Sequence, residues 1–204
     1  MDTLQSLSPD DEAARERLYS ASPDMVQRTC GWSDINTGSW NTEGLKAFAP
    51  MLADAFSELQ ADVDVIETEG FEAVGASGKA EMQMTGPVIE VTGRPDADVQ
   101  IIMSGHYDTV FPAGTFQGVT DLGDGRLNGP GMADMKGGLC VMLEALKAFE
   151  AGPLKDRLGY RIVLTPDEEI GNFASAKYLT RAAKSGAMIG MTYEPAMETG
   201  AMSG

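Results

Sequence analysis

The sequence predicts an α/β protein in which helices cover a central sheet. In the second half of its 204 residues, short apolar runs alternate with segments of helical periodicity, as expected when helices connect neighbouring strands. Hydrophobic residues make up 43% of the chain, which is enough to build a core. The length corresponds to one domain or slightly more.

Two helices are expected first. Ser8 can cap the free N–H groups of a helix, Pro9 suits its first position, and the acids that follow complement the helix dipole. A second helix is expected from Thr42, and Pro50 within it is expected to bend it. Its apolar stripe recurs at spacings of three and four, at Leu45, Phe48, Leu52, Phe56 and Leu59.

Strands and helices then follow in alternation. Apolar runs predict strands over residues 63–68, 88–92 and 99–104. Asp124 and Gly125 suit a tight hairpin turn that leads into 126–128. The remaining elements expected are a helix over 136–150, a strand over 160–165, a helix over 173–184 and a strand over 188–193.

Charge and composition exclude several classes of function. With 31 acidic and 15 basic residues, the net charge is −16, which argues against nucleic acid and against anionic membrane surfaces as partners. The longest apolar run, 139–143, is too short to span a bilayer, and the N-terminus lacks signal-peptide features. Cys30 and Cys140 are isolated, as in reduced proteins. We therefore expect a cytoplasmic protein.

Four polar clusters lie where a predicted strand ends or a predicted helix begins. His106 and Asp108 follow one strand, and Glu194 follows another. Asp134 lies among four glycines at the start of a helix, and three acids, 167–169, follow the strand at 160–165. Each cluster alone has an ordinary explanation: a His–Asp hydrogen bond in a loop, a helix cap or a solvated acidic face.

Together the clusters supply one imidazole and several carboxylates, a donor set suited to zinc or a similar divalent metal. A further carboxylate beside the metal could deprotonate a water molecule. Calcium is disfavoured because the sequence has no D-x-D-x-D-G loop. A serine hydrolase is disfavoured because there is no G-x-S-x-G and only one histidine.

In order and spacing, these motifs resemble those of the co-catalytic di-zinc exopeptidases and deacylases. This family includes glutamate carboxypeptidase, acetylornithine deacetylase, succinyl-diaminopimelate desuccinylase and aminoacylase. The resemblance covers roughly residues 25 to 200, and the 42–44 helix start also fits. It implies a catalytic domain with a mixed, mostly parallel sheet flanked by helices. The substrate implied is a small peptide or an N-acyl amino acid.

The resemblance also implies a role for each site residue. His106 would bind one metal and Asp108 would orient its ring. Asp134, expected to precede a cis peptide bond, would bridge two Zn²⁺ ions, for which Co²⁺ or Mn²⁺ could substitute. Glu168 would be the general base. Glu169 would bind the second metal and Glu194 would complete the first site, and a Glu at this last position accompanies carboxypeptidases and deacylases.

One family ligand has no counterpart here, because the pattern ends with another histidine and His106 is the single one. We therefore expect residues 1–204 to form the N-terminal part of a catalytic domain, truncated before a lid and dimerisation domain through which full-length relatives form homodimers. Weak occupancy of the second metal site, little turnover and an exposed sheet edge should follow. Two alternatives stay open: a short non-catalytic relative that binds one metal as an interaction or regulatory domain, and an acidic domain without metal.

Overall fold

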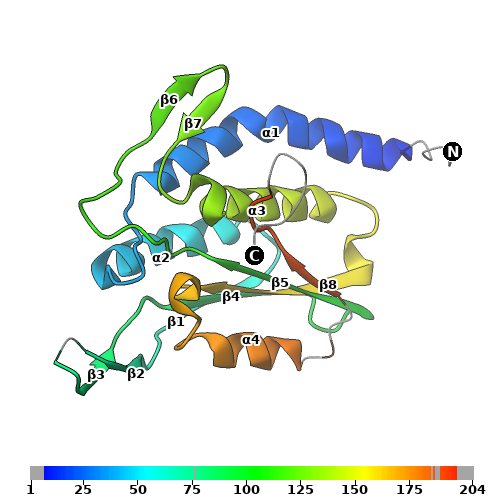
Figure 1. The fold of residues 1–204 in the computed structure, drawn as a ribbon. Coiled ribbons are helices and arrows are strands. Elements are labelled where there is room, and N and C mark those ends of the chain that lie inside the picture. The colour runs from blue at the N-terminus through cyan, green and yellow to red at the C-terminus, as the bar shows by residue number, and fades with distance from the viewer. Residues whose placement is uncertain (1–6, 76, 185, 187–188, 197–204) are drawn as a thin grey trace, which may run out of the picture.

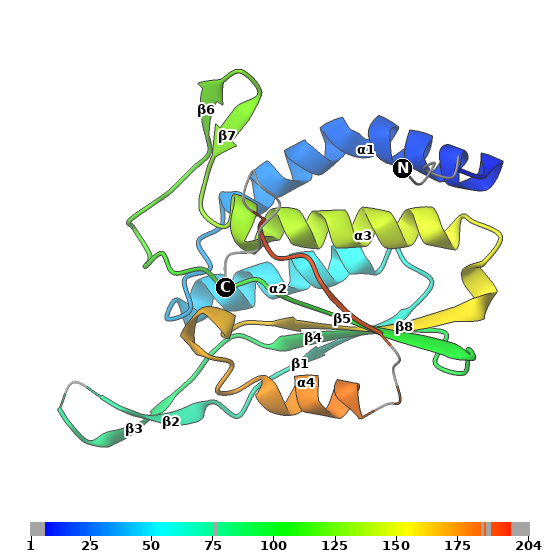
Figure 2. The same cartoon turned by 45° about the vertical axis from the view of Figure 1, so that its right-hand side comes forward.

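The computed structural model describes residues 7–75, 77–184, 186 and 189–196. A five-stranded sheet lies between two helical layers (Figure 1). Helices α2 (Thr42–Phe56) and α3 (Gly137–Glu150) cover one face, and α1 (Pro9–Ser33) packs on α3 outside them. Helix α4 (Ala176–Ala183) covers the opposite face (Figure 2). The predicted α/β class is therefore confirmed.

The helix starts are set by local chemistry. Ser8 and Asp11 form a reciprocal capping box at the start of α1, with Pro9 in the first turn as predicted. Helix α2 continues through Pro50 as one element, so the proline does not end it. Helix α4 begins later than the predicted residue 173. The preceding turn is held instead by Asp167, whose carboxylate accepts a 2.7 Å hydrogen bond from the Ala174 N–H.

The sheet is mixed, and its strand order brings three strand ends together. The order is β1-β4-β8-β5-β9, where β5 pairs in parallel with β8 and β9 and β4 pairs antiparallel with β1 and β8. Parallel pairing is thus confined to the half that carries the clusters. The carboxyl ends of β5, β8 and β9 meet at one edge, where ligands bind in α/β sheets. The strands are β1 (Asp62–Ile66), β4 (Val88–Gly93), β5 (Val99–His106), β8 (Leu158–Thr165) and β9 (Ile189–Thr192).

Two hairpins project from this body. The predicted turn at Asp124 and Gly125 joins β6 (Thr120–Gly123) to β7 (Arg126–Asn128), and both turn residues have positive φ, 54° and 72°. The second hairpin, β2 (Phe71–Val74) with β3 (Ala80–Gln83), was not predicted from the sequence. Strand β9, which ends the sheet, is exposed along its length.

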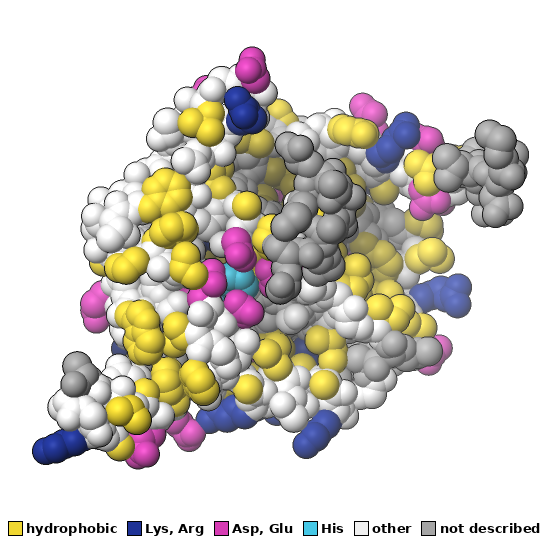
Figure 3. Space-filling model, viewed as in Figure 1, with side chains coloured by type: hydrophobic (Ala, Val, Ile, Leu, Met, Phe, Trp, Pro, Cys, Tyr) yellow, Lys and Arg dark blue, Asp and Glu magenta, His cyan; other side chains and the backbone are white. Residues whose placement is uncertain are grey.

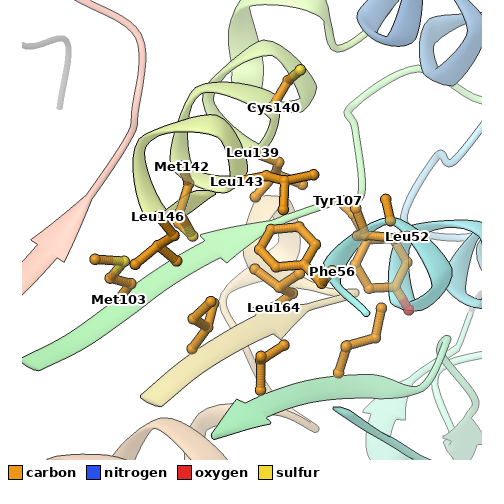
Figure 4. Packing of buried hydrophobic residues seen from close by; sticks show 14 of the residues in the cluster. Leu52, Phe56, Met103, Tyr107, Leu139, Cys140, Met142, Leu143, Leu146 and Leu164 are labelled. Atoms are coloured by element: carbon orange, nitrogen blue, oxygen red, sulfur yellow. The ribbon is translucent and has the colours of Figure 1, made fainter. Parts of the chain in front are cut away.

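The main core lies between the sheet and the layer of α2 and α3. Figure 4 shows Leu52 and Phe56 of α2 beside Tyr107, with Leu139 and Leu143 of α3 packed above Leu164. All six side chains are fully buried. Burial on this scale fixes the loops that follow β5 and β8, because both strands are anchored in the core. A smaller cluster lies between the sheet and α4, and it consists of Val88, Val163, Tyr178 and Ala182.

Within the described ranges, no helix has both the length and the apolar character needed to cross a membrane. Both cysteines are free thiols, with Cys140 buried and Cys30 partly so.

Candidate metal centre

His106 ends β5 and is 1% exposed, with its ring held from one side. Its Nδ1 lies 3.1 Å from the backbone oxygen of Asp108 and 3.3 Å from the Oδ1 of the same residue. An Nδ1–H group would donate to both of these oxygens. In the neutral ring, that arrangement leaves the lone pair on Nε2, the nitrogen that faces the other cluster residues.

Carboxylates surround His106 Nε2. Asp134 Oδ1 lies at 2.9 Å, Glu194 Oε2 at 3.7 Å and Glu168 Oε2 at 3.9 Å. One ligand atom each from His106, Asp134 and Glu169 fall within 4.8 Å of one another. Figure 3 shows acidic side chains gathered around the single histidine. The structure therefore brings together all the residues that the sequence nominated as metal ligands.

The buried carboxylate of Asp108 organises this cluster. Besides facing the His106 ring, it accepts hydrogen bonds from the backbone N–H groups of Glu168 (3.1 Å) and Glu169 (3.2 Å). It also accepts a 2.7 Å hydrogen bond from Ser39 Oγ. Asp108 thus ties β5 to the turn after β8. Ser39 was missed from the sequence, where its loop carries no motif.

The segment around Asp134 has the unusual backbone that its glycines suggested. The Asp134–Met135 peptide bond is cis, as the resemblance implied, and Gly131 has a φ of 70°. Met135 is buried, and its Sδ accepts a hydrogen bond of 3.2 Å from the backbone N–H of His106. The Asp134 side chain is about half exposed, at 51%. Its carboxylate is therefore available to a ligand from solvent.

Lys136 connects this segment to the end of α1. Its side chain is fully buried, and Nζ donates to the backbone oxygens of Trp32 (3.0 Å) and Ile35 (2.8 Å) at the end of α1. Nζ also lies 4.9 Å from the centre of the Phe48 ring. Burial lowers the pKa of Lys136 to about 7. No sequence pattern marked Lys136 as part of the site, because a lysine at a helix start is usually solvated.

The pKa shifts in the cluster reflect the number of carboxylates gathered there. Burial lowers the pKa of His106, but the hydrogen bond and charge of Asp108, with Glu194 and Glu168, outweigh it and raise the value to about 9. Burial and the neighbouring carboxylates raise the pKa of Glu169 to about 7, despite the opposing effect of His106. Burial likewise raises the pKa of Glu194.

A cation among these groups would relieve their mutual repulsion. The mixed nitrogen and oxygen donors fit zinc or a related divalent metal.

The three consecutive acids have different roles. Glu168 and Glu169 face the cluster, whereas Asp167 is buried and directed toward the turn before α4, where it accepts from Ala174 N–H. Burial raises the pKa of Asp167, although hydrogen bonds from Ser175 and Ala174 oppose this. The run of three acids alone did not show that Asp167 supports the turn before α4 while Glu168 and Glu169 face the cluster.

The chain is similar to known proteins in sequence and in fold. The family model described as Peptidase family M20/M25/M40 matches residues 102–203. Carboxypeptidase G2 from Pseudomonas sp. (strain RS-16) is 26% identical over 163 residues, which cover 79% of this chain and 36% of the relative.

Among solved structures, human carnosine dipeptidase 1 superposes with a TM-score of 0.74 at 19% identity, over 94% of this chain and 42% of its own. The dipeptidase Dug1p from Saccharomyces cerevisiae gives 0.73 at 16% identity, over 89% and 40%. The chain therefore spans less than half the length of each of these proteins.

Proposed function

Because the chain belongs to the M20/M25/M40 peptidase family, we propose that it carries the metal-binding part of an enzyme that hydrolyses the amide bond of a small peptide or an N-acyl amino acid. The reaction would be of the carboxypeptidase or deacylase type. One observation carries the proposal. His106 is held through Nδ1 by Asp108, while its Nε2 faces the carboxylates of Asp134, Glu168 and Glu194.

The proposed metal ligands are His106, Asp134, Glu169 and Glu194, with zinc as the favoured ion and Co²⁺ or Mn²⁺ as substitutes. Bound metal would polarise the amide carbonyl and lower the pKa of a water molecule. Asp108 would keep the imidazole in the tautomer and orientation that present Nε2.

Glu168 is the proposed general base. Its side chain is 46% exposed, and its Oε2 lies 3.9 Å from His106 Nε2. Its backbone N–H is fixed by Asp108 at 3.1 Å. A carboxylate that is close to the ligands and open to solvent can accept a proton from the attacking water and deliver it to the leaving amine. The products would be a carboxylate and an amine.

Glu168→Ala tests this role, with the exposed Glu72→Ala as the matched control. Zinc content and the hydrolysis of a panel of dipeptides and N-acetyl amino acids are measured for the wild type and both variants. We expect Glu168→Ala to keep its zinc and to lose hydrolysis by about 10²- to 10⁴-fold, while Glu72→Ala keeps both. Wild-type rates in Glu168→Ala would contradict the assignment. A zinc-loaded wild type that cleaves no substrate would refute catalysis by this chain.

We also propose that the protein works in a reducing compartment such as the cytoplasm. The free thiols of Cys30 and Cys140 support this proposal, because oxidising compartments favour paired cysteines.

A further inference from the structure

A hollow of about 230 Å³ lies directly beside the candidate metal centre. Glu169, one of the candidate ligands, forms part of its wall. The apolar part of the wall is made by Trp40, Val110, Pro112 and Ile170. A group that enters this hollow is thus next to the cluster around His106.

Two of the segments that form this wall, 38–40 and 109–112, are hydrogen-bonded to each other. The backbone N–H of Ser39 donates to the Thr109 oxygen (3.1 Å), and the N–H of Thr109 donates to the Thr37 oxygen (2.9 Å). Gly38 packs so closely that an added Cβ would lie 2.3 Å from the Phe111 oxygen. The side chain of Ser39 continues this network to Asp108. The pocket wall and the His106 ring are therefore held by one set of hydrogen bonds.

The wall exposes large apolar side chains that the fold does not need in its core. Trp40 and Val110 are each 61% exposed. The Trp40 ring lies 6.4 Å from Phe71, which stacks at 5.2 Å on Phe173, itself 66% exposed. In Figure 3, hydrophobic side chains adjoin the acidic cluster. Exposed apolar surface in a hollow beside polar catalytic groups is typical of a ligand pocket.

Charge and size define what the pocket can accept. Among the residues that the structure describes, its wall contains the Glu169 carboxylate and no lysine or arginine, so it offers no cationic side chain to an anionic group. A closed apolar cavity of about 150 Å³ holds a benzene molecule, and this hollow is larger, at about 230 Å³.

We propose that this pocket receives an uncharged apolar group of the substrate, up to benzyl size, adjacent to the scissile amide. Trp40, Val110 and Ile170 are then specificity-determining residues, and substrates with an acidic group at this position are disfavoured. This inference rests on the proposed function, because the pocket shares Glu169 with the metal centre.

Hydroxamates of graded side group test the pocket on the zinc-loaded chain. Acetohydroxamate probes the metal alone, phenylacetohydroxamate adds the apolar group, and the monohydroxamate of succinic acid adds a charge. Affinities are measured by calorimetry, and each variant's own acetohydroxamate affinity is its reference. In the wild type we expect phenylacetohydroxamate to bind at least about tenfold more tightly than acetohydroxamate. The succinic derivative should bind no more tightly than acetohydroxamate.

Val110→Asp should reduce this gain to less than about threefold, because it places a charge in the apolar wall. Trp40→Ala should reduce it as well. The matched control is Val26→Asp, which changes an exposed valine of α1 outside the pocket and should keep the full gain. The inference is overturned if the wild type shows no phenyl gain while acetohydroxamate binds, or if Val110→Asp keeps the gain.

Failure of the proposed function gives a different result. In that case none of the three hydroxamates binds the zinc-treated wild type, or Asp134→Ala binds acetohydroxamate as well as the wild type does. Either result refutes the metal centre and the pocket assignment together. Loss of the phenyl gain alone refutes only the pocket.

Discussion

Replacing Asp108 by Asn should weaken metal binding while the fold is kept. The side chain is fully buried, and its two oxygens receive contacts from Ser39, Glu168, Glu169 and His106. Asparagine preserves the volume but offers one acceptor oxygen, and its NH₂ group can only donate. Some donors that now face a carboxylate oxygen would therefore face another donor.

The expected loss of stability in Asp108→Asn follows from these contacts. Oδ1 accepts from Glu168 N–H at 3.1 Å and Oδ2 from Glu169 N–H at 3.2 Å, so either placement of the amide leaves one backbone N–H without an acceptor. A buried donor without a partner costs about 1–3 kcal/mol. In a chain of this length, the Tm should therefore fall by about 3–10 °C.

The metal affinity should fall as well. Loss of a carboxylate behind a metal-binding histidine typically weakens affinity about 10- to 100-fold. Because the backbone oxygen of Asp108 also contacts Nδ1, at 3.1 Å, and is kept in the variant, we expect the smaller loss of about tenfold.

Zinc affinity is measured by competition with a chromophoric chelator, and stability by thermal unfolding. Asp167→Asn is the matched control, because Asp167 is equally buried and lies in the turn after β8 that Asp108 contacts, but is directed toward α4. It should keep zinc affinity within about twofold. Wild-type zinc affinity in Asp108→Asn would refute the argument that Asp108 orients the metal-binding ring.

Two further predictions concern stability. Glu58 accepts hydrogen bonds from Arg28 (2.9 Å) and Lys147 (2.6 Å); burial raises its pKa, but these partners outweigh burial and lower it. Since the folded-state pKa is the lower one, the stabilisation is present at pH 7 and is lost as the pH falls through it. Urea unfolding should show Glu58→Gln less stable by ~0.5 kcal/mol at pH 7, a small effect because the side chain is 41% exposed. The difference from wild type should shrink as the pH is lowered to 3, and a difference that does not shrink would contradict this. Lys136→Met removes the buried donor from two carbonyl groups at the end of α1 and should lower the unfolding free energy by about 1–3 kcal/mol, whereas an unchanged urea midpoint would show that these bonds contribute nothing net.

The features that could be predicted from the sequence are those set by local chemistry. Ser8 and Pro9 mark the start of α1, and Asp124–Gly125 marks a hairpin turn, because caps and turns depend on residues a few positions apart. The hairpin of β2 and β3 was missed because its strands are short and largely exposed. Its Phe71 packs on Phe173, a contact across the chain that no local pattern reveals.

In the candidate site, too, some residues could be predicted from local sequence and others depend on tertiary contacts. His106, Asp134, Glu169 and Glu194 could be nominated because each lies at the end of a predicted element, and the parallel strands bring these ends together. The supporting residues could not be nominated. The Ser39 hydroxyl reaches Asp108 across 69 positions, and Lys136 Nζ reaches the end of α1 across 104. Such partners depend on tertiary packing, which local sequence patterns do not encode.

Whether these side chains form a metal centre can be decided from the zinc content of the purified protein. Elemental mass spectrometry is applied to the purified wild type, to Asp134→Ala and to the control Asp121→Ala, which changes an exposed acid of the β6 strand. A metal centre at these residues predicts at least about one zinc per chain after dialysis for the wild type and Asp121→Ala, and loss of that zinc in Asp134→Ala. A wild type without zinc, or equal zinc in Asp134→Ala, would contradict it.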